Sequence, residues 1–233
     1  MSQMAAYVAT EEEKKRPVEM PQDTGVKVPN TFYVRHGKRI LDILLSGIAL
    51  LIIWPILLII SLIVLIEFGR PILFPMDRPG LNGKIFRIYK FHDLNDKKGP
   101  NGDLLPPEQR TTKIGSFLRA SSLDELPQLL NILKGDMSII GPRPLLKIYL
   151  PRYNDRQMMR HAVRPGLECP SLVKRDHVRT WEEQFEDDVW YVEHMSLAVD
   201  VRMVLGVVKM MIDRKDTKRR GEATREEFMG AEG

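Results

Sequence analysis

Two adjacent carboxylates, Asp124 and Glu125, begin a stretch whose residue types could do chemistry. Ser122 and Glu125 have the Ser-x-x-Glu spacing of a capping box, and the leucines that follow recur at helical spacing, so we expect a helix to begin here. Gly135 is placed to end that helix. Acidic residues favour any helix start, because the helix dipole stabilises them by about 0.3–1 kcal/mol each. The two carboxylates alone therefore do not define a site.

Two further features favour a constrained site over an ordinary helix start. Pro127 lies beyond the first N–H groups of the expected helix, which have no partner in any helix, so it should remove a hydrogen bond. Arg143 lies between Pro142 and Pro144, which fix the backbone around a guanidinium whose planar shape matches phosphate oxygens. A solvated arginine in a rigid turn is the alternative interpretation of Arg143.

Composition limits the partners and the chemistry. The net charge of +4 over 233 residues favours an anionic partner, but charge does not choose among nucleic acid, anionic lipid and a phosphorylated substrate. The single cysteine, Cys169, excludes an internal disulfide and a multi-cysteine zinc site. A nucleophile pair of Cys169 and His177 has no support from spacing, so a structural cysteine is the better interpretation.

Residues 43–66 contain no charged side chain and are long enough, at about 1.5 Å per residue, to cross a hydrocarbon core of roughly 30 Å. The segment starts too deep in the chain and is too long for a signal peptide. Pro55 near its middle invites a bend. Basic residues flank both ends, so the positive-inside bias is small. A kinked transmembrane helix and a bent helix that returns to the same face both fit these facts.

The remaining patterns predict the supporting elements. Residues 72–74 and 85–91, separated by a turn rich in Gly, Pro and Asn, predict a β-hairpin, and residues 95–110 predict a loop. Helices are expected at 114–120, 145–163, 181–195 and 197–212, and Pro151 is expected to interrupt the second of them. The basic residues of the second of these helices should form a solvated face, with lipid headgroups as the alternative partner: Lys147, Arg152, Arg156 and Arg160.

In this arrangement the chain resembles the bacterial sugar transferase family, the small monotopic phosphoglycosyl transferases. The resemblance covers nearly everything from Arg35 to Val208, and its 124–144 part is the most specific. The matching motifs are Lys38-Arg39 with Asp42, Arg78-x-Gly80-x-x-Gly83-Lys84-x-Phe86, Tyr89-Lys90-Phe91, Gly115-x-x-Leu118-Arg119, Ser122-Leu123-Asp124-Glu125-Leu126-Pro127-Gln128-Leu129, Asn131-x-Leu133-Lys134-Gly135-Asp136-Met137-Ser138-x-x-Gly141-Pro142-Arg143-Pro144, Arg164-Pro165-Gly166 and Asp188-Val189-Trp190-Tyr191-Val192.

The resemblance implies an α/β, mostly helical, monotopic membrane protein at the cytoplasmic face of a bacterial inner membrane. It favours the re-entrant form of the membrane helix. The expected parts are a mobile N-terminal segment at 1–34, a re-entrant membrane helix with basic flanks at 35–70, a compact cytoplasmic catalytic domain with a small β-hairpin and amphipathic surface helices at 71–212, and a charged tail at 213–233.

The family activity is transfer of a phosphosugar from a nucleotide diphosphosugar to polyprenol phosphate, as the first membrane step of glycoconjugate and polysaccharide assembly. By resemblance Asp124 is the nucleophile, and Mg²⁺ offsets the repulsion between its carboxylate and the substrate phosphates. Glu125 is the candidate for orienting or binding that ion, and Asp188 is a second candidate ligand. Three cations are expected to bind phosphate: Lys90, Arg119 and Arg143.

The chain departs from the family pattern at two places. After Pro165-Gly166-Leu167 the family usually continues Thr-Gly-Trp-Ala-Gln-Val-Asn-Gly-Arg, whereas this chain has a different sequence at 168–176. The usual Lys-Phe-Arg-Thr-Met is replaced by residues 90–94, Lys-Phe-His-Asp-Leu. The sequence therefore does not name the sugar, and uridine as the base is inherited from the family.

Two other functions are compatible with the same residues. A membrane-bound phosphohydrolase would form the same Asp124 adduct and give it to water. A basic membrane-surface adaptor would recruit acidic partners, and it leaves Arg143 between its prolines unexplained. Membrane lipids are expected partners, nucleic acid is not, and the polar and apolar faces of the last helix would allow a homodimer.

Overall fold

The computed structural model describes residues 19–169, 177, 179–212 and 228–230, and it contains two compact units. Unit 1 consists of Met1–Arg39, Asp77–Phe86 and Asp136–Gly233, and unit 2 consists of Ile40–Met76 and Arg87–Gly135. The predicted domain at 71–212 therefore contains parts of both units. Most of the predicted segment at 1–34 and of the tail at 213–233, and most of the altered loop at 168–176, lie outside the described residues.

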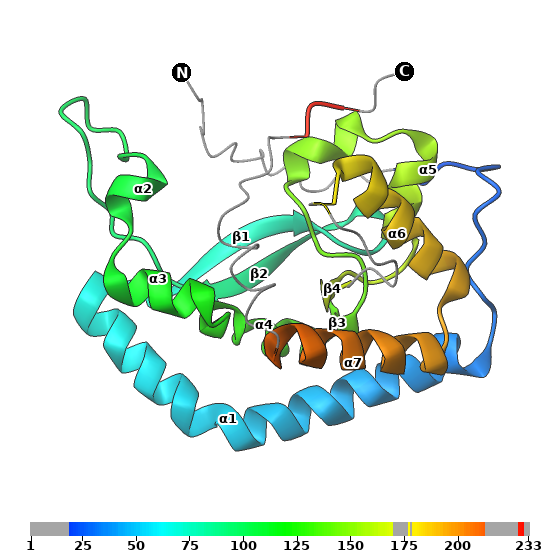
Figure 1. The fold of residues 1–233 in the computed structure, drawn as a ribbon, viewed down its shortest axis with the longest axis horizontal. Coiled ribbons are helices and arrows are strands. Elements are labelled where there is room, and N and C mark those ends of the chain that lie inside the picture. The colour runs from blue at the N-terminus through cyan, green and yellow to red at the C-terminus, as the bar shows by residue number, and fades with distance from the viewer. Residues whose placement is uncertain (1–18, 170–176, 178, 213–227, 231–233) are drawn as a thin grey trace. The chain divides into compact units, whose positions relative to one another are not determined.

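The predicted β-hairpin is confirmed. Strands β1 (Leu73–Pro79) and β2 (Ile85–Phe91) form a two-stranded sheet, joined by a 3₁₀ turn at Leu81–Gly83 (Figure 1). The turn closes with Gly80 N–H donating to the Lys84 carbonyl at 2.9 Å. Both units contribute residues to this hairpin.

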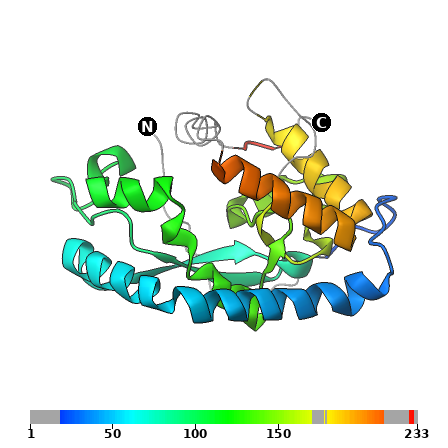
Figure 2. The ribbon, with the colours of Figure 1, turned by 60° about the horizontal axis from the view of Figure 1, so that its bottom comes forward.

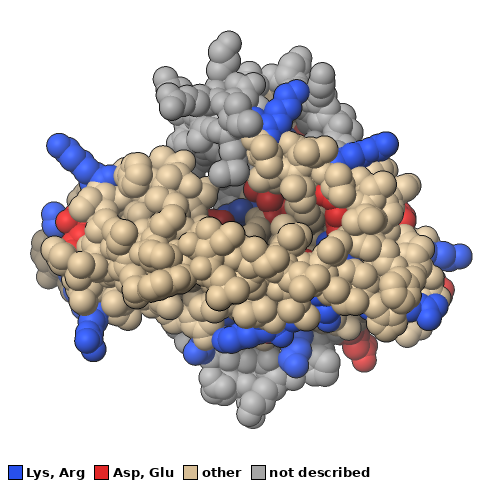
Figure 3. Space-filling view, turned by 90° about the horizontal axis from the view of Figure 1, so that it is seen from below, with Lys and Arg blue, Asp and Glu red and all other residues tan. Residues whose placement is uncertain are grey.

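The predicted apolar helix is α1 (Lys38–Phe68), which continues through Pro55. Together with the preceding π-turn at Tyr33–Gly37 it is the one helix, among the described residues, that is long and apolar enough to cross a membrane. The helix changes direction along its length, as proline inside a helix commonly causes (Figure 1). Most of its large apolar side chains are exposed, and its surface is largely free of charged side chains (Figure 3).

The C-terminal half of α1 belongs to the core of unit 2. Ile60 and Val64 of α1 are buried with Phe91 of β2 and Leu118 of α3 (Lys113–Ala120). Helix α3 confirms the helix predicted at 114–120, and the Thr112 side chain caps it by accepting from Gly115 N–H. A short helix α2 (Pro107–Arg110) lies inside the stretch predicted as a loop.

The helix predicted to begin at Ser122 is wrong in its first part. Leu123–Glu125 form a 3₁₀ turn, and the α-helix α4 (Gln128–Lys134) begins only after Pro127. Ser122 has a left-handed φ of 57° and makes no side-chain cap, so the expected capping box is absent here. Pro127 explains the change, because it has no N–H to give an α-helix and its ring clashes with the carbonyl four residues earlier. Gly135 ends α4 with a φ of 100°, as predicted.

Unit 1 is built on α6 (Trp181–His194) and α7 (Leu197–Ile212), which confirm two predicted helices; Figure 2 shows α7 beside α6. Their apolar faces share one core with strand β3 (Ser138–Ile140). The strand β4 (Gly166–Glu168) pairs in parallel with β3, with Ser138 opposite Gly166. Val26 joins this core, so the predicted N-terminal segment is packed at this point. The sequence patterns did not indicate β3 or β4.

The segment 145–163, predicted as helical with an interruption at Pro151, forms three short elements. A 3₁₀ turn at Lys147–Arg152 precedes α5 (Asp155–Met158), and a second 3₁₀ turn follows at Met159–Ala162. Pro151 prevents one continuous helix, and a capping box restarts the chain, with Asn154 accepting from the N–H of Gln157.

Among the described residues of the predicted C-terminal tail, Phe228 is buried against unit 1. Phe228 is buried in an aromatic cluster with Tyr149 and Phe185, and Trp181 packs against it. The guanidinium of Arg152 donates to the Phe228 carbonyl. This cluster fixes residues 228–230 on unit 1.

The close approach of β3 and β4 supplies a test of the fold. A Cβ at Gly166 would lie 2.1 Å from the Gly141 nitrogen, which no side chain tolerates without moving the backbone. We expect Gly166→Ala to lower the free energy of unfolding by about 1–3 kcal/mol through overpacking. Urea unfolding in detergent, followed by circular dichroism, measures this loss.

Gly99→Ala is the matched control, because its new methyl group would lie at ordinary contact distances, 3.4 Å from the end of the Leu105 side chain and 3.9 Å from the Asp103 carbonyl. Equal stability of Gly166→Ala and Gly99→Ala would contradict the close approach.

Candidate active site

The carboxylate of Asp124 is the centre of the site in unit 2. Asp124 is 2% exposed, and its Oδ2 lies 2.5 Å from the ammonium nitrogen of Lys90. A carboxylate buried without a partner costs several kcal/mol, so the ion pair with Lys90 offsets the cost of burying Asp124. Lys90, predicted as a phosphate-binding residue, is thus first of all the partner of the candidate nucleophile.

The backbone around Asp124 is held by apolar contacts with a core that includes the long helix α1. Leu123 and Leu126 lie on either side of Asp124 in the sequence, and both pack on the cluster that contains Ile60 and Val64 of α1. The turn begins at Ser122, whose left-handed φ is uncommon for a residue with a side chain. Unusual backbone conformations persist where the surrounding structure enforces them, and they cluster at functional sites.

Glu125 is half-buried on the same turn and gives the site its second carboxylate. In proteins Mg²⁺ is commonly held by one or two carboxylates together with substrate phosphates and water. Across the described residues, no group of three or more His, Cys, Asp or Glu side chains could hold a metal ion. The two adjacent carboxylates, Asp124 and Glu125, are of the ligand type that an ion shared with a phosphorylated substrate would use.

Arg119 lies in unit 2 at the end of α3, where two side chains hold its guanidinium. Its Nε lies 3.3 Å from Oδ2 of Asp93, and its Nη2 donates to the Thr111 hydroxyl at 2.8 Å. Asp93 is one of the residues in which this chain departs from the family pattern. The phosphate-binding role of Arg119 stays a prediction.

Arg143 lies in unit 1, directly after β3 and Gly141-Pro142. Its side chain is 42% exposed, donates from Nη1 to the Leu167 carbonyl at 3.1 Å and lies 3.7 Å from a carboxylate oxygen of Glu168. An ion pair this long and this exposed is worth little, so an incoming phosphate can compete for the guanidinium. Glu168 is the first residue of the altered loop, and it places a negative charge next to Arg143.

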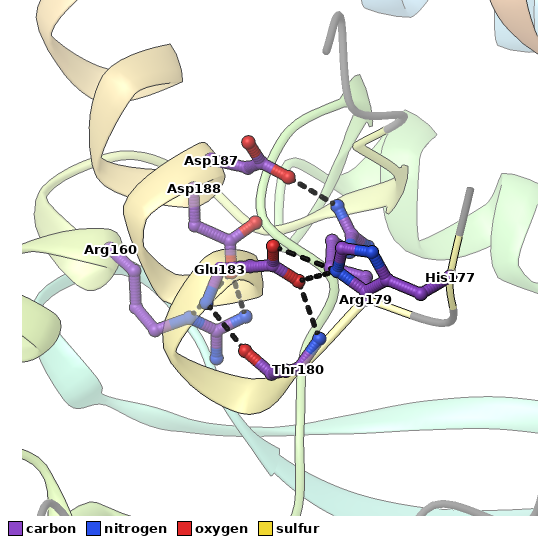
Figure 4. A network of polar contacts seen from close by, with 7 residues as sticks. All are labelled: Arg160, His177, Arg179, Thr180, Glu183, Asp187 and Asp188. Carbon is purple, nitrogen blue, oxygen red and sulfur yellow. Dashed lines mark hydrogen bonds and ion pairs between the residues drawn. The ribbon is translucent and has the colours of Figure 1, made fainter. Parts of the chain in front are cut away.

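Asp188, predicted as a second metal ligand, is paired with an arginine in unit 1. The carboxylate is 1% exposed and accepts two hydrogen bonds on Oδ2 from Arg160, at 3.0 and 2.7 Å (Figure 4). The other polar contacts around the start of α6 tie Arg179 to Asp187 and His177 to Glu183. The geometry gives the Asp188 carboxylate a guanidinium as its partner, and a role of Asp188 as metal ligand stays a prediction.

Arg160 corrects a further prediction, because it was assigned to a solvated face. Its side chain is 1% exposed, whereas Arg156, one turn earlier, does lie at the surface and pairs with Glu186. Burial alone would lower the pKa of Arg160, but the carboxylate of Asp188 outweighs it and raises that pKa above its ordinary value. Burial, and then the charge of Arg160, lower the pKa of His161 to about 3, so this ring is neutral. The helical pattern at 145–163 did not indicate that Arg160 is buried, because the segment forms three short elements in place of the helix on which the solvated face was predicted.

A second polar cluster that the sequence did not reveal joins the base of α1 to α7 within unit 1. Asp200 of α7 accepts from the Tyr191 hydroxyl at 2.7 Å and pairs with Lys38 at 2.5 Å, and it also accepts from Tyr33. Lys38 is one of the residues that carry the family resemblance. The cluster fixes the point at which the chain enters its long apolar helix.

Comparison with known sequences identifies the family. A sequence model of the bacterial sugar transferases matches residues 33–214, which is most of the chain, so the chain belongs to the bacterial sugar transferase family. The resemblance predicted from its motifs is confirmed.

Two relatives illustrate the range of the family. The chain is 40% identical over 195 residues to the uncharacterized sugar transferase EpsL of Bacillus subtilis (strain 168), covering 83% of this chain and 96% of EpsL. It is 35% identical over 190 residues to the UDP-glucose:undecaprenyl-phosphate glucose-1-phosphate transferase of Escherichia coli (strain K12), covering 76% of this chain but only 40% of that protein.

A third relative carries a different sugar in its name. The UDP-N-acetylgalactosamine-undecaprenyl-phosphate N-acetylgalactosaminephosphotransferase of Aeromonas hydrophila is 33% identical over 197 residues, which is 81% of this chain and 46% of the relative. The chain thus spans less than half the length of these two relatives. These names support the class of phosphoglycosyl transferase for this chain, and they differ in the sugar.

The burial of Cys169 supplies a test of whether this cysteine could act as a nucleophile. The thiol is buried, and burial raises its pKa well above the ordinary value. A reagent therefore has little access to the sulfur, and little of the thiol is in the reactive thiolate form. We expect a maleimide reagent at neutral pH to label native protein at least about 100-fold more slowly than protein unfolded in guanidinium chloride, because labelling needs local opening.

A cysteine introduced at exposed Gln22 serves as the control for reagent activity on the folded protein. Labelling of Cys169 as fast as that of the introduced cysteine would restore it as a candidate nucleophile.

Proposed function

We propose that this protein transfers a phosphosugar from a nucleotide diphosphosugar, with uridine as the expected base, to polyprenol phosphate at the membrane surface. The observation that carries the proposal is the carboxylate of Asp124, buried beside Lys90 on a turn that packs against α1. The relatives named for UDP-sugars and undecaprenyl phosphate support this choice of substrates.

In the first step a carboxylate oxygen of Asp124 attacks the β-phosphorus of the donor. The new Asp124 O–P bond forms as the bond from that phosphorus to the bridging oxygen breaks, and the nucleotide monophosphate leaves with the bridging oxygen. The sugar phosphate is then held on the enzyme as an acyl phosphate.

In the second step an oxygen of polyprenol phosphate attacks the same phosphorus, the Asp124 O–P bond breaks, and polyprenol diphosphosugar is released. Lys90 has a role in both steps. Its ammonium group, 2.5 Å from Asp124 Oδ2, stabilises the free carboxylate. When Asp124 is esterified its charge is lost, and Lys90 then becomes available to the oxygens of the bound phosphate.

Two further groups balance the negative charge of the reactants. Glu125, with Asp124, is the candidate ligand set for Mg²⁺, and a bound ion would offset the repulsion between carboxylate and phosphates. The exposed guanidinium of Arg143 is the candidate for binding phosphate oxygens from its proline-stiffened loop.

The lipid acceptor requires the site to work at a membrane. We place the protein at the cytoplasmic face of the bacterial inner membrane, with α1 bent at Pro55 so that it enters and leaves by the same leaflet. α7 has a row of exposed apolar side chains suited to lie at the level of the headgroups: Leu197, Val201, Val204, Leu205 and Val208.

The catalytic assignment is tested with purified protein, polyprenol phosphate, Mg²⁺ and a panel of nucleotide diphosphosugars. We expect release of nucleotide monophosphate with at least one uridine donor. Asp124→Asn should lower that rate roughly a thousandfold or more, because an amide cannot form the phosphosugar adduct. Removing divalent ions with a chelator should also abolish turnover, and added Mg²⁺ should restore it.

The matched control is Asp155→Asn, which neutralises an exposed carboxylate of α5 and should turn over like the parent. Turnover by Asp124→Asn at the parental rate would refute the nucleophile. Release of sugar phosphate without polyprenol phosphate would instead identify a hydrolase, and a protein inactive with every donor would favour the adaptor.

The path of α1 is tested by topology. Single cysteines at exposed Gln22 and Asp96, on either side of α1 in the sequence, are labelled with a membrane-impermeant maleimide in sealed vesicles of each orientation. We expect both positions to label from the cytoplasmic face, because a re-entrant helix keeps its two flanks on one side. Labelling of the two cysteines from opposite faces would show that α1 crosses the membrane.

A further inference from the structure

We propose that Arg160 and Asp188 are positioning residues that fix the backbone of the Arg143 loop, residues 141–144, so that its guanidinium can bind phosphate. This inference rests on the proposed phosphosugar transfer. Asp188 then acts through Arg160 and Arg143 and does not bind metal.

Arg160 holds three different parts of unit 1 at once. Its Nη2 donates both to Asp188 on α6, at 2.7 Å, and to the backbone carbonyl of Arg143, at 2.8 Å. Its Nε donates to Asp188 at 3.0 Å, and its Nη1 donates to the Tyr153 hydroxyl at 3.3 Å. The planar fork of a guanidinium is required for this set, because the point charge of a lysine could not reach the three partners together.

The Arg143 loop needs such a side-chain donor. Pro142 and Pro144 have no backbone N–H, so the loop has few donors of its own. Its first half is held by the β3–β4 sheet. Gly141 N–H donates to the backbone carbonyl of Glu168, and the Pro142 carbonyl accepts from Gly166 N–H at 3.1 Å. The Arg143 carbonyl, in the second half, is held by Arg160.

Stability alone does not explain a buried ion pair here. Replacing both charges of a buried pair by apolar side chains of similar volume is often neutral or stabilising, because the pair recovers little more than its desolvation cost. Arg160 and Asp188 are each 1% exposed, while the guanidinium that they help to position is 42% exposed. The structure thus combines a rigid backbone with a side chain that a ligand can reach.

The pair is also electrically neutral as a unit. Asp188 balances the charge of Arg160, so the two together add little field at the Arg143 guanidinium. Their effect on phosphate binding should therefore come from geometry. This separates them from Glu168, whose carboxylate lies 3.7 Å from the Arg143 guanidinium.

The test uses the double variant Arg160→Met/Asp188→Leu in the full-length, membrane-reconstituted protein. Removing both charges together avoids leaving one of them buried and unpaired. We expect hydrogen exchange of the peptide 141–146 to accelerate roughly tenfold, as the loss of about one hydrogen bond predicts, while the peptides of α7 stay unchanged.

Kinetics provide a second readout, the coupling to Arg143. In the parent, Arg143→Gln should lower kcat/KM for the donor by about 100-fold, mainly through KM, because a charge-assisted phosphate contact is lost. In the double variant, kcat/KM should already be reduced roughly tenfold, and adding Arg143→Gln should then cost less than about tenfold more, since residues acting as one unit are not additive.

Arg160→Lys is the second variant, in case the double variant does not fold. The lysine keeps a cation beside Asp188 but lacks the several N–H donors of the guanidinium, so hydrogen exchange in the Arg143 loop should accelerate in the same measurement. The matched control is Arg156→Gln/Glu186→Gln, which removes an exposed ion pair between α5 and α6 at 2.9 Å, and it should leave exchange and kinetics as in the parent.

The outcomes separate this inference from the proposed function. If the parent turns over but exchange at 141–146 and the effect of Arg143→Gln are the same with and without the Arg160–Asp188 pair, the positioning role is wrong. If the parent transfers no phosphosugar from any donor, the proposed function fails. Loop exchange, which needs no substrate, then still decides whether the pair holds the Arg143 loop.

Discussion

The arrangement of unit 2 around the site depends on the ion pair between Lys90 and Asp124. Burial of a carboxylate that is 2% exposed is costly unless a cation lies beside it, so β2 must present Lys90 to the turn that carries Asp124. Leu123 and Leu126 pack that turn on the apolar cluster that includes Ile60 and Val64 of α1. The same contacts that bury Asp124 therefore tie it to the apolar core that includes α1, the helix expected to enter the membrane.

Unit 1 contains a second buried pair with a different consequence. Arg160 and Asp188 lie between α6 and the Arg143 carbonyl, and they hold a backbone instead of exposing a reactive group. Figure 4 shows how α6 gathers further ion pairs around its first turns. In unit 2 the charges of Lys90 and Asp124 are part of the proposed chemistry. In unit 1 the Arg160–Asp188 pair fixes the backbone position of Arg143.

The long apolar helix α1, the β-hairpin and the helices α3, α6 and α7 follow from composition and periodicity, because each depends on a long or regular apolar pattern. The short elements do not. The 3₁₀ turn at Leu123–Glu125 replaced an expected capped helix because Pro127 overrode the capping pattern. Strands β3 and β4 are three residues each, and their parallel pairing joins segments far apart in the chain, which no local pattern records.

By itself the sequence determined the family, the apolar helix and the residue types of the site, since these depend on local order along the chain: Asp124 beside Glu125, and Arg143 between two prolines. Only the tertiary structure decided which charges meet. It paired Lys90 with Asp124 across 34 positions of sequence, and it moved Arg160 from an expected solvated face to the interior beside Asp188. Burial gives each of these partnerships its strength, and burial is a property of the packed molecule.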